Sequence, residues 1–116
     1  MKKQGRDFQS DAFDILQSHR DILDLISLQV VDLLSERMKV CMRIAELKAL
    51  HKIAMMQPGR VSYVIDMVRE KSKTVGLRPE YIESLFKIII SETCSQESLL
   101  INQCISQGRA HENTVG

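Results

Sequence analysis

Apolar side chains recur at helical spacing through most of the first half of the chain. They advance in steps of three and four residues, at Ile22, Leu23, Ile26, Val30, Leu33, Leu34, Val40, Cys41, Ile44 and Leu47. Such steps place side chains on one face of an α-helix. Ser10 or Asp11 can cap the start of this helix, and the pattern fades between His51 and Ile53. The pattern therefore predicts one helix of about 40 residues.

Two shorter helices are predicted in the second half. Pro58 lies near the first turn of one helix, which runs to about Thr74 and is ended by Gly76 as a C-terminal cap residue. Pro79 opens the next helix. Its regularly spaced positions are Ile82, Leu85, Phe86, Ile89, Ile90, Thr93, Glu97, Leu100 and Cys104. We therefore expect three helices.

The composition supports an all-α fold. The 116 residues include only five glycines and two prolines, and neither type occurs between Gly5 and Pro58. β-Sandwiches and α/β folds need frequent turns, which recruit both residue types, so the composition excludes these classes. We expect a single helical domain over residues 1–116, ordered over about 10–106 and followed by a polar tail over 107–116.

The remaining composition excludes several function classes. No stretch approaches the roughly 18 uncharged apolar residues of a membrane-spanning helix, and no apolar segment follows the N-terminal lysines as a secretory signal requires. The net charge of +1 gives no electrostatic footprint for nucleic acid. Three cysteines indicate thiols in a reducing cytoplasm, and no CxxC, HExxH or histidine cluster supports a metal site. We expect a cytoplasmic protein without a metal, nucleic-acid or membrane partner.

The length of the first helix predicts a dimer. A helix of about 40 residues is about 60 Å long, whereas a compact domain of this size has a radius of gyration of about 13 Å. The two shorter helices are not enough to cover it. We therefore predict an intertwined homodimer in which the long helices of two chains cover each other. The alternative is a bend near residues 50–54 that gives a four-helix monomer.

Two cations interrupt the apolar face of the long helix. Arg37 and Lys48 lie eleven residues apart, with Cys41 and Ile44 between them; they are nearly in register and about 16 Å apart along the helix axis. A single arginine or lysine on such a face usually extends its charge to the solvent at the rim. Two cations on one stripe, matched by polar residues on another helix, favour a binding site.

The matching polar residues are Thr93 and Glu97, one turn apart on the third helix. A buried glutamate is costly unless it is paired or protonated, so a structural ion pair with Lys48 or Arg37 is one interpretation. The other interpretation is a pocket in the helix bundle lined by cations, a hydroxyl and a carboxyl, with Arg60 at the entry to the second helix. Fixed cations suit a small polyanionic ligand such as a dicarboxylate.

The spacing of these residues resembles that of the all-helical class of chorismate mutases, over roughly residues 15–105. Sixteen residues separate Arg20 from Arg37, and ten separate Arg37 from Lys48. The matching segments are LLSERM around Arg37, IAELK ending in Lys48, MMQPGRV with Arg60, and YIESLFKIIISETCSQE with Thr93 and Glu97. The resemblance implies an isomerase that rearranges chorismate to prephenate in the shikimate pathway to the aromatic amino acids. It implies no cofactor.

The resemblance also implies roles for the residues. Arg37 and the partner subunit's Arg20 would bind the two carboxylates of the substrate, with Arg60 and Thr93 in support. The residues with catalytic roles would be Lys48, Glu97 and Arg37. Lys48 would donate hydrogen bonds to a carboxylate and to the breaking ether oxygen, and protonated Glu97 would donate to that oxygen from its other side. Rate enhancement would come from holding a reactive conformer and stabilising the charge on that oxygen.

The sequence departs from the family pattern at two positions near the ring substituent. Val61 stands where many members have a glutamate after the helix arginine, and Gln57 stands where an acidic residue is often seen. Isochorismate-pyruvate lyases carry valine at the first position, and 4-amino-4-deoxychorismate mutases resemble the chain in ETCSQE and MMQPGRV. Both remain alternatives to a chorismate mutase. A non-catalytic helical binding module is a third.

Overall fold

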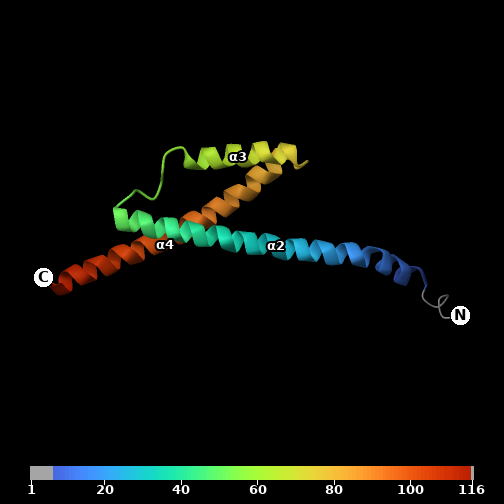
Figure 1. Ribbon diagram of the computed structural model, residues 1–116, viewed down its shortest axis with the longest axis horizontal. Coiled ribbons are helices and arrows are strands. Elements are labelled where there is room, and N and C mark those ends of the chain that lie inside the picture. The colour runs from blue at the N-terminus through green and yellow to red at the C-terminus, as the bar shows by residue number, and fades with distance from the viewer. Residues whose placement is uncertain (1–6, 116) are drawn as a thin grey trace. The chain divides into compact units, whose positions relative to one another are not determined.

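Three helices make up the described chain, as the periodicity predicts. The computed structural model describes the backbone of residues 7–115 and the side chains of residues 13–107. The helices are α2 (Asp7–His51), α3 (Arg60–Thr74) and α4 (Pro79–Val115), and the described backbone contains no strand (Figure 1). The all-α class is confirmed. The chain divides after Arg37 into two units, residues 1–37 and 38–116.

Helix α2 contains the long apolar pattern in one piece. It begins at Asp7, so the prediction that Ser10 or Asp11 caps its start is wrong, because both residues lie inside the helix. It ends at His51, where the periodicity fades. Residues 52–59 that follow are not helical. The four-helix alternative is therefore wrong.

The end of α2 is closed by a left-handed turn. The Ile53 N–H donates to the Lys48 carbonyl at 2.8 Å, and Lys52 between them has a φ of 55°. This hydrogen bond from the residue after the left-handed position is the Schellman pattern of helix C-termini. It reverses the chain just after the last turn of α2, so the linker over residues 52–59 starts beside Lys48.

Helix α3 is bounded by two glycines with positive φ. Gly59, at φ 80°, precedes Arg60, so Pro58 lies in the turn before the helix rather than in its first turn. Gly76, at φ 77°, follows the helix end, and the Leu77 N–H donates to the Ser72 carbonyl at 3.0 Å. The predicted C-terminal cap is confirmed, because only glycine adopts this conformation at little cost.

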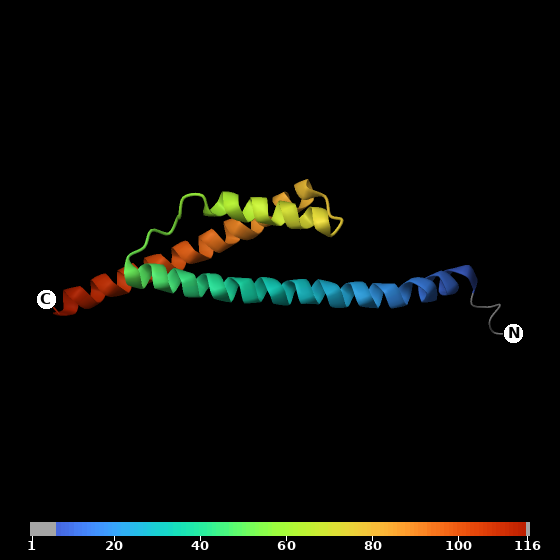
Figure 2. The same cartoon turned by 45° about the horizontal axis from the view of Figure 1, so that its top comes forward.

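Helix α4 begins at Pro79, as predicted, and packs against α3 (Figures 1 and 2). Its backbone remains helical to Val115, beyond residue 106, where the sequence predicts the start of a polar tail. The side chains after Gln107 lie outside the described residues. No helix within the described residues is both long enough and apolar enough to cross a membrane.

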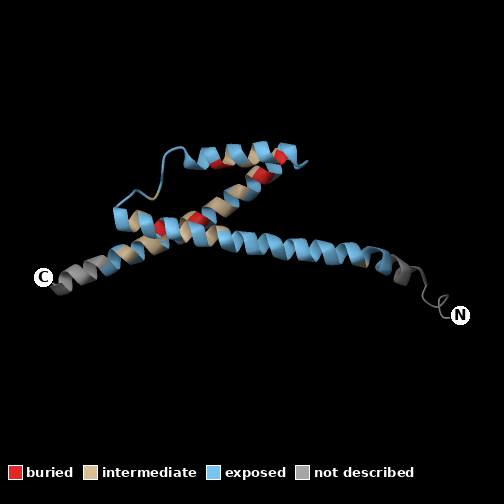
Figure 3. Cartoon of the chain, in the orientation of Figure 1, coloured by how far each residue is buried: buried red, intermediate tan, exposed pale blue. Residues whose placement is uncertain are grey.

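The described core is small and belongs to the unit of residues 38–116. Its buried apolar residues are Ala45, Val64 and Ile82, and its buried polar residues are Ser72, Thr93 and Glu97 (Figure 3). In the unit of residues 1–37, large apolar side chains of α2 are exposed. They are Phe13, Ile15, Leu16, Ile22, Leu23, Leu25, Ile26, Leu28, Val30, Val31, Leu33 and Leu34. So much exposed apolar surface on one helix is characteristic of an interaction surface.

Candidate functional site

Lys48 and Glu97 lie side by side in the unit of residues 38–116. Lys48 is in the last turn of α2 and Glu97 is on α4. Lys48 Nζ lies 3.6 Å from Glu97 Oε2, and the two side chains are only 14% and 9% exposed. Burial of this kind makes the pair interact more strongly than a surface pair does. The ion pair that the sequence allows between these two residues is therefore present.

Thr93 lies one turn before Glu97 on the same face of α4, and both residues are buried. The Thr93 hydroxyl donates to the main-chain carbonyl of Ile89 at 2.9 Å. The main-chain carbonyl four residues earlier in a helix is the usual acceptor for a threonine hydroxyl. The polar interruptions in the apolar pattern of α4 thus correspond to buried polar groups.

The Lys48 ammonium has a second partner. It donates to the main-chain carbonyl of Met55, in the linker between α2 and α3, at 2.7 Å. The Met55 side chain is tied to α4, because the Ser98 hydroxyl donates to Met55 Sδ at 2.9 Å. Sequence reasoning missed both contacts. A carbonyl carries no residue signature, and Ser98 lies off the apolar line of its helix.

The two arginines predicted on α2 belong to the unit of residues 1–37. Arg20 is exposed and Arg37 is half-buried. They are 37 − 20 = 17 residues apart on one continuous helix, which separates them by about 25 Å. That separation prevents both side chains of one chain from reaching a single small ligand.

Arg60 is the first residue of α3 and is exposed. Its guanidinium lies over the Tyr63 ring, 5.5 Å from the centroid, an arrangement that attracts a cation to the negative face of the ring. Gln57, three residues before Arg60, uses its side-chain amide to donate to the Ala54 carbonyl at 2.7 Å. Val61 is 39% exposed. The predicted cation at the entry to α3 is therefore present on the surface of this chain.

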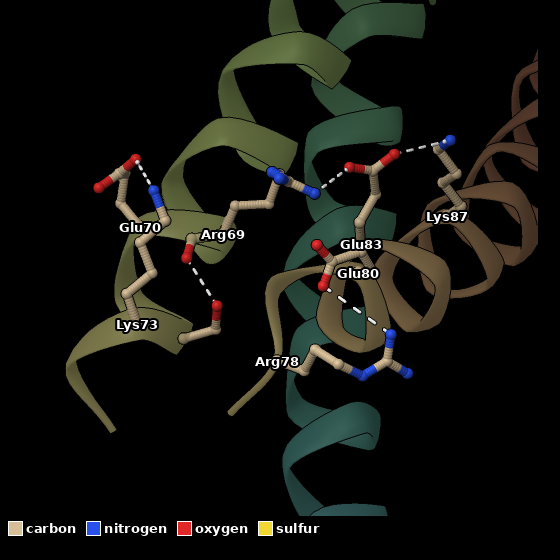
Figure 4. Close-up of polar contacts among 8 residues, drawn as sticks. Arg69, Glu70, Lys73, Arg78, Glu80, Glu83 and Lys87 are labelled. Carbon is tan, nitrogen blue, oxygen red and sulfur yellow. Dashed lines mark hydrogen bonds and ion pairs between the residues drawn. The ribbon is translucent and has the colours of Figure 1, made fainter. Parts of the chain in front are cut away.

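A separate network of ions joins α3 to α4 (Figure 4). Glu83 accepts from Arg69 at 2.7 Å and lies 2.9 Å from the Lys87 ammonium. The Lys87 ammonium, and then the Arg69 guanidinium, hold the pKa of the Glu83 carboxyl below its usual value of 4.5. This network supports the packing of the two helices that carry Arg60 and Glu97.

The Lys48–Glu97 pair brings an ammonium and a carboxyl group together at a site that is mostly shielded from solvent. A lysine ammonium has three donors, of which the Met55 carbonyl takes one. The others can serve an anionic ligand, and a protonated Glu97 adds another donor. Within the described residues, no group of three or more histidine, cysteine or acidic side chains is placed to hold a metal ion. The chemistry available at the pair is hydrogen bonding to an oxygen that gains charge.

Comparison with known proteins identifies the family. The model of chorismate mutase type II matches residues 19–98. The chain belongs to this family. The match covers more than half of the chain and includes every predicted site residue, so the resemblance drawn from the spacing is confirmed. As a member of the chorismate mutase type II family, the chain is an isomerase of that type.

Three known proteins are similar to this chain in sequence. A 4-amino-4-deoxychorismate mutase of Streptomyces pristinaespiralis is 35% identical over 86 residues, 74% of this chain and 67% of the relative. A protein of the same name from Streptomyces venezuelae is 35% identical over 88 residues, 76% of this chain and 85% of the relative. The T-protein of Enterobacter agglomerans is 23% identical over 83 residues, 72% of this chain but only 22% of the relative.

Proposed function

We propose that the chain rearranges chorismate to prephenate without a cofactor. In this reaction the ether C–O bond of the substrate breaks while a C–C bond forms within the same molecule, so no group leaves and no electrons are gained or lost. Negative charge grows on the ether oxygen as its bond to the ring breaks. The observation that carries the proposal is the Lys48–Glu97 pair, 3.6 Å apart and mostly buried, in a chain of the chorismate mutase type II family.

In this proposal Lys48 and Glu97 act on the ether oxygen. The Lys48 ammonium donates one hydrogen bond to that oxygen and another to a substrate carboxylate. Glu97 donates from the other side of the oxygen, for which it must hold a proton. Donors fixed in advance around a developing charge lower the barrier because they need no reorganisation during the reaction.

The substrate carboxylates are assigned to arginines. Arg37 binds one carboxylate and Arg20 of the partner subunit binds the other, since a guanidinium matches the geometry of a carboxylate with two parallel hydrogen bonds. Arg60 and Thr93 support this binding. Holding both ends of the substrate keeps it in the compact conformer that reacts.

The partner subunit is a second copy of this chain. The exposed apolar side chains along residues 13–34 of α2 support an intertwined homodimer, because a helix with so much apolar surface is stabilised by burying it.

The cysteines, Cys41, Cys94 and Cys104, are present as thiols. This supports a place in the reducing cytoplasm.

A second candidate function is that of a 4-amino-4-deoxychorismate mutase, the same rearrangement on a substrate with an amino group at ring position 4. Two relatives that are 35% identical carry this name. Val61 has no hydrogen-bonding side chain for a ring hydroxyl, and the Gln57 amide is engaged by the Ala54 carbonyl. Neither position therefore supplies the carboxylate that many family members have near the ring substituent, so a substituent other than the hydroxyl of chorismate is compatible with this chain.

The test supplies the purified chain with chorismate, 4-amino-4-deoxychorismate and isochorismate in parallel. Liquid chromatography with mass spectrometry separates rearrangement, which gives an isomer of unchanged mass, from elimination, which releases pyruvate. We expect rearrangement of chorismate. A much higher kcat/KM for the amino analogue would establish the second candidate, and pyruvate release from isochorismate would make the chain a lyase. Turnover of none of the three would overturn the proposal and favour a binding module.

A further inference from the structure

One residue of the linker between α2 and α3, Met55, is hydrogen-bonded both to Lys48 on α2 and to Ser98, next to Glu97, on α4. The Met55 carbonyl accepts from the Lys48 ammonium at 2.7 Å. The Met55 sulfur accepts, at 2.9 Å, from the hydroxyl of Ser98, which follows Glu97 on α4. Met55 therefore bridges the helix that carries Lys48 and the helix that carries Glu97.

Met55 differs from the rest of its linker. In residues 52–59, all of which the structure describes, Met55 is half-buried and every other residue is exposed. Its neighbours Ile53 and Met56 are 48% and 56% exposed. The Met55 side chain is thus the anchor by which this non-helical segment is held against α4.

We propose that Met55 is a positioning residue for Lys48, and that Ser98 holds Met55 in place. The Met55 carbonyl accepts a hydrogen bond from one of the three N–H groups of the Lys48 ammonium. This hydrogen bond restricts the Lys48 side chain, which has four rotatable bonds. The direction of that carbonyl depends on the linker backbone, which no helix or strand fixes. The Ser98–Met55 hydrogen bond fixes it. The effect on catalysis rests on the proposed function, whereas the anchoring of Lys48 does not.

The consequence for catalysis follows from the role of preorganisation. A donor that already points at the ether oxygen lowers the barrier without moving, whereas a loosely held one must first be ordered. Loss of the anchor should therefore lower kcat more than it raises KM, because the proposed site binds the carboxylates of the substrate mainly through Arg37 and the partner subunit's Arg20, neither of which is part of the linker.

The test uses two substitutions that remove the same hydrogen bond from opposite sides. Ser98→Ala removes the donor, and Met55→Leu removes the acceptor while keeping the side-chain volume nearly unchanged. The double variant completes the cycle. Two matched controls are Ser95→Ala, at an exposed position on the same helix, and Met56→Leu, at an exposed position in the same linker.

We expect either single variant to lower kcat about five-fold, the usual effect of one hydrogen bond between neutral groups. The substrate is whichever of chorismate or its amino analogue the wild-type chain turns over. The kcat of the double variant should be no lower than that of the less active single variant, because both substitutions remove the same interaction. The two control variants should match the wild type.

A second readout measures Lys48 directly. Trace acetylation of the intact protein with acetic anhydride, followed by peptide mass spectrometry, reports the accessibility of each lysine amine. We expect Lys48 to be acetylated severalfold faster in Ser98→Ala and Met55→Leu than in the wild type, with exposed Lys39 as the internal reference. A general loosening of the fold would not single out Lys48.

Unchanged acetylation of Lys48 in both variants would overturn the inference, whatever happens to kcat. Losses of kcat that add in the double variant would also overturn it, because they would show two independent effects. If the wild-type chain turns over neither substrate, faster acetylation of Lys48 in the two variants would be a different result: the positioning role of Met55 would stand and the proposed function would fail.

Discussion

Lys48 and Glu97 are 49 residues apart in sequence, yet Lys48 Nζ lies 3.6 Å from Glu97 Oε2. Each residue interrupts the apolar face of its own helix. In the folded chain the two residues form one polar pair, which is mostly shielded from solvent. In the function that we propose for this member of the chorismate mutase type II family, the reacting oxygen binds at this pair.

The first prediction concerns the ammonium group. Lys48→Ala should lower kcat/KM by roughly 100- to 1000-fold, the usual cost of removing one donor to a developing oxyanion. Steady-state kinetics on the preferred substrate measures this loss. Lys39→Ala, at an exposed position on the same helix, is the matched control and should retain wild-type activity. If Lys48→Ala keeps more than about a tenth of the rate, Lys48 is not a donor to the reacting oxygen.

The second prediction concerns the Glu97 side chain. A glutamine amide supplies a permanent donor at the same position, so Glu97→Gln should keep most of the wild-type kcat, whereas Glu97→Ala supplies no donor and should lower kcat by roughly 100-fold. Steady-state kinetics of both variants and the wild type on the preferred substrate measures the difference. Equal losses in Glu97→Gln and Glu97→Ala would show that Glu97 does not donate to the substrate.

The third prediction concerns the shared site. Arg20 and Arg37 are too far apart on α2 to bind one small substrate within a chain, since 17 residues of helix span about 25 Å. Mixing inactive Arg20→Ala and Arg37→Ala chains should therefore restore activity, because each mixed dimer has one site with both arginines intact. Native mass spectrometry checks that the chains exchange. Exchange without any gain in activity would mean that each site uses one chain only.

Much of the fold could be predicted because its signals are local. The end of α2 at His51 and the beginning of α4 at Pro79 coincide with a fading apolar period and a proline. Gly76 ends α3 because its positive φ suits glycine. The beginning of α2 was harder to predict, because capping residues such as Ser10 are also tolerated inside a helix when the surrounding periodicity continues.

The candidate site could be predicted only where a polar residue interrupts an apolar line. Thr93 and Glu97 gave that signal, and both are buried. Met55 gave none, because its contribution is a main-chain carbonyl whose direction is set by the left-handed turn at Lys52 and by the contact with Ser98. Contacts of this kind depend on how the linker returns to the helices, which no local pattern encodes.

The last prediction concerns stability at low pH. The Lys87 ammonium and the Arg69 guanidinium hold the pKa of Glu83 below its usual value of 4.5, so the unfolded chain binds this proton more readily than the folded chain does. The stabilising contribution of Glu83 is therefore complete above about pH 4.5 and is lost as the pH falls through the lowered pKa. Glu83→Gln should unfold at a lower urea concentration than the wild type at neutral pH.

The difference between Glu83→Gln and the wild type at neutral pH should disappear at an acidic pH below the lowered pKa of Glu83, where the wild-type carboxyl is protonated. Glu70→Gln is the matched control. Its partner Lys73 is 3.0 Å away, but both side chains are more than half exposed, and such surface pairs contribute little. Glu70→Gln should therefore follow the wild type at both pH values. A Glu83→Gln deficit that is the same size at neutral and acidic pH would show that Glu83 stabilises the helix pair by packing rather than by charge.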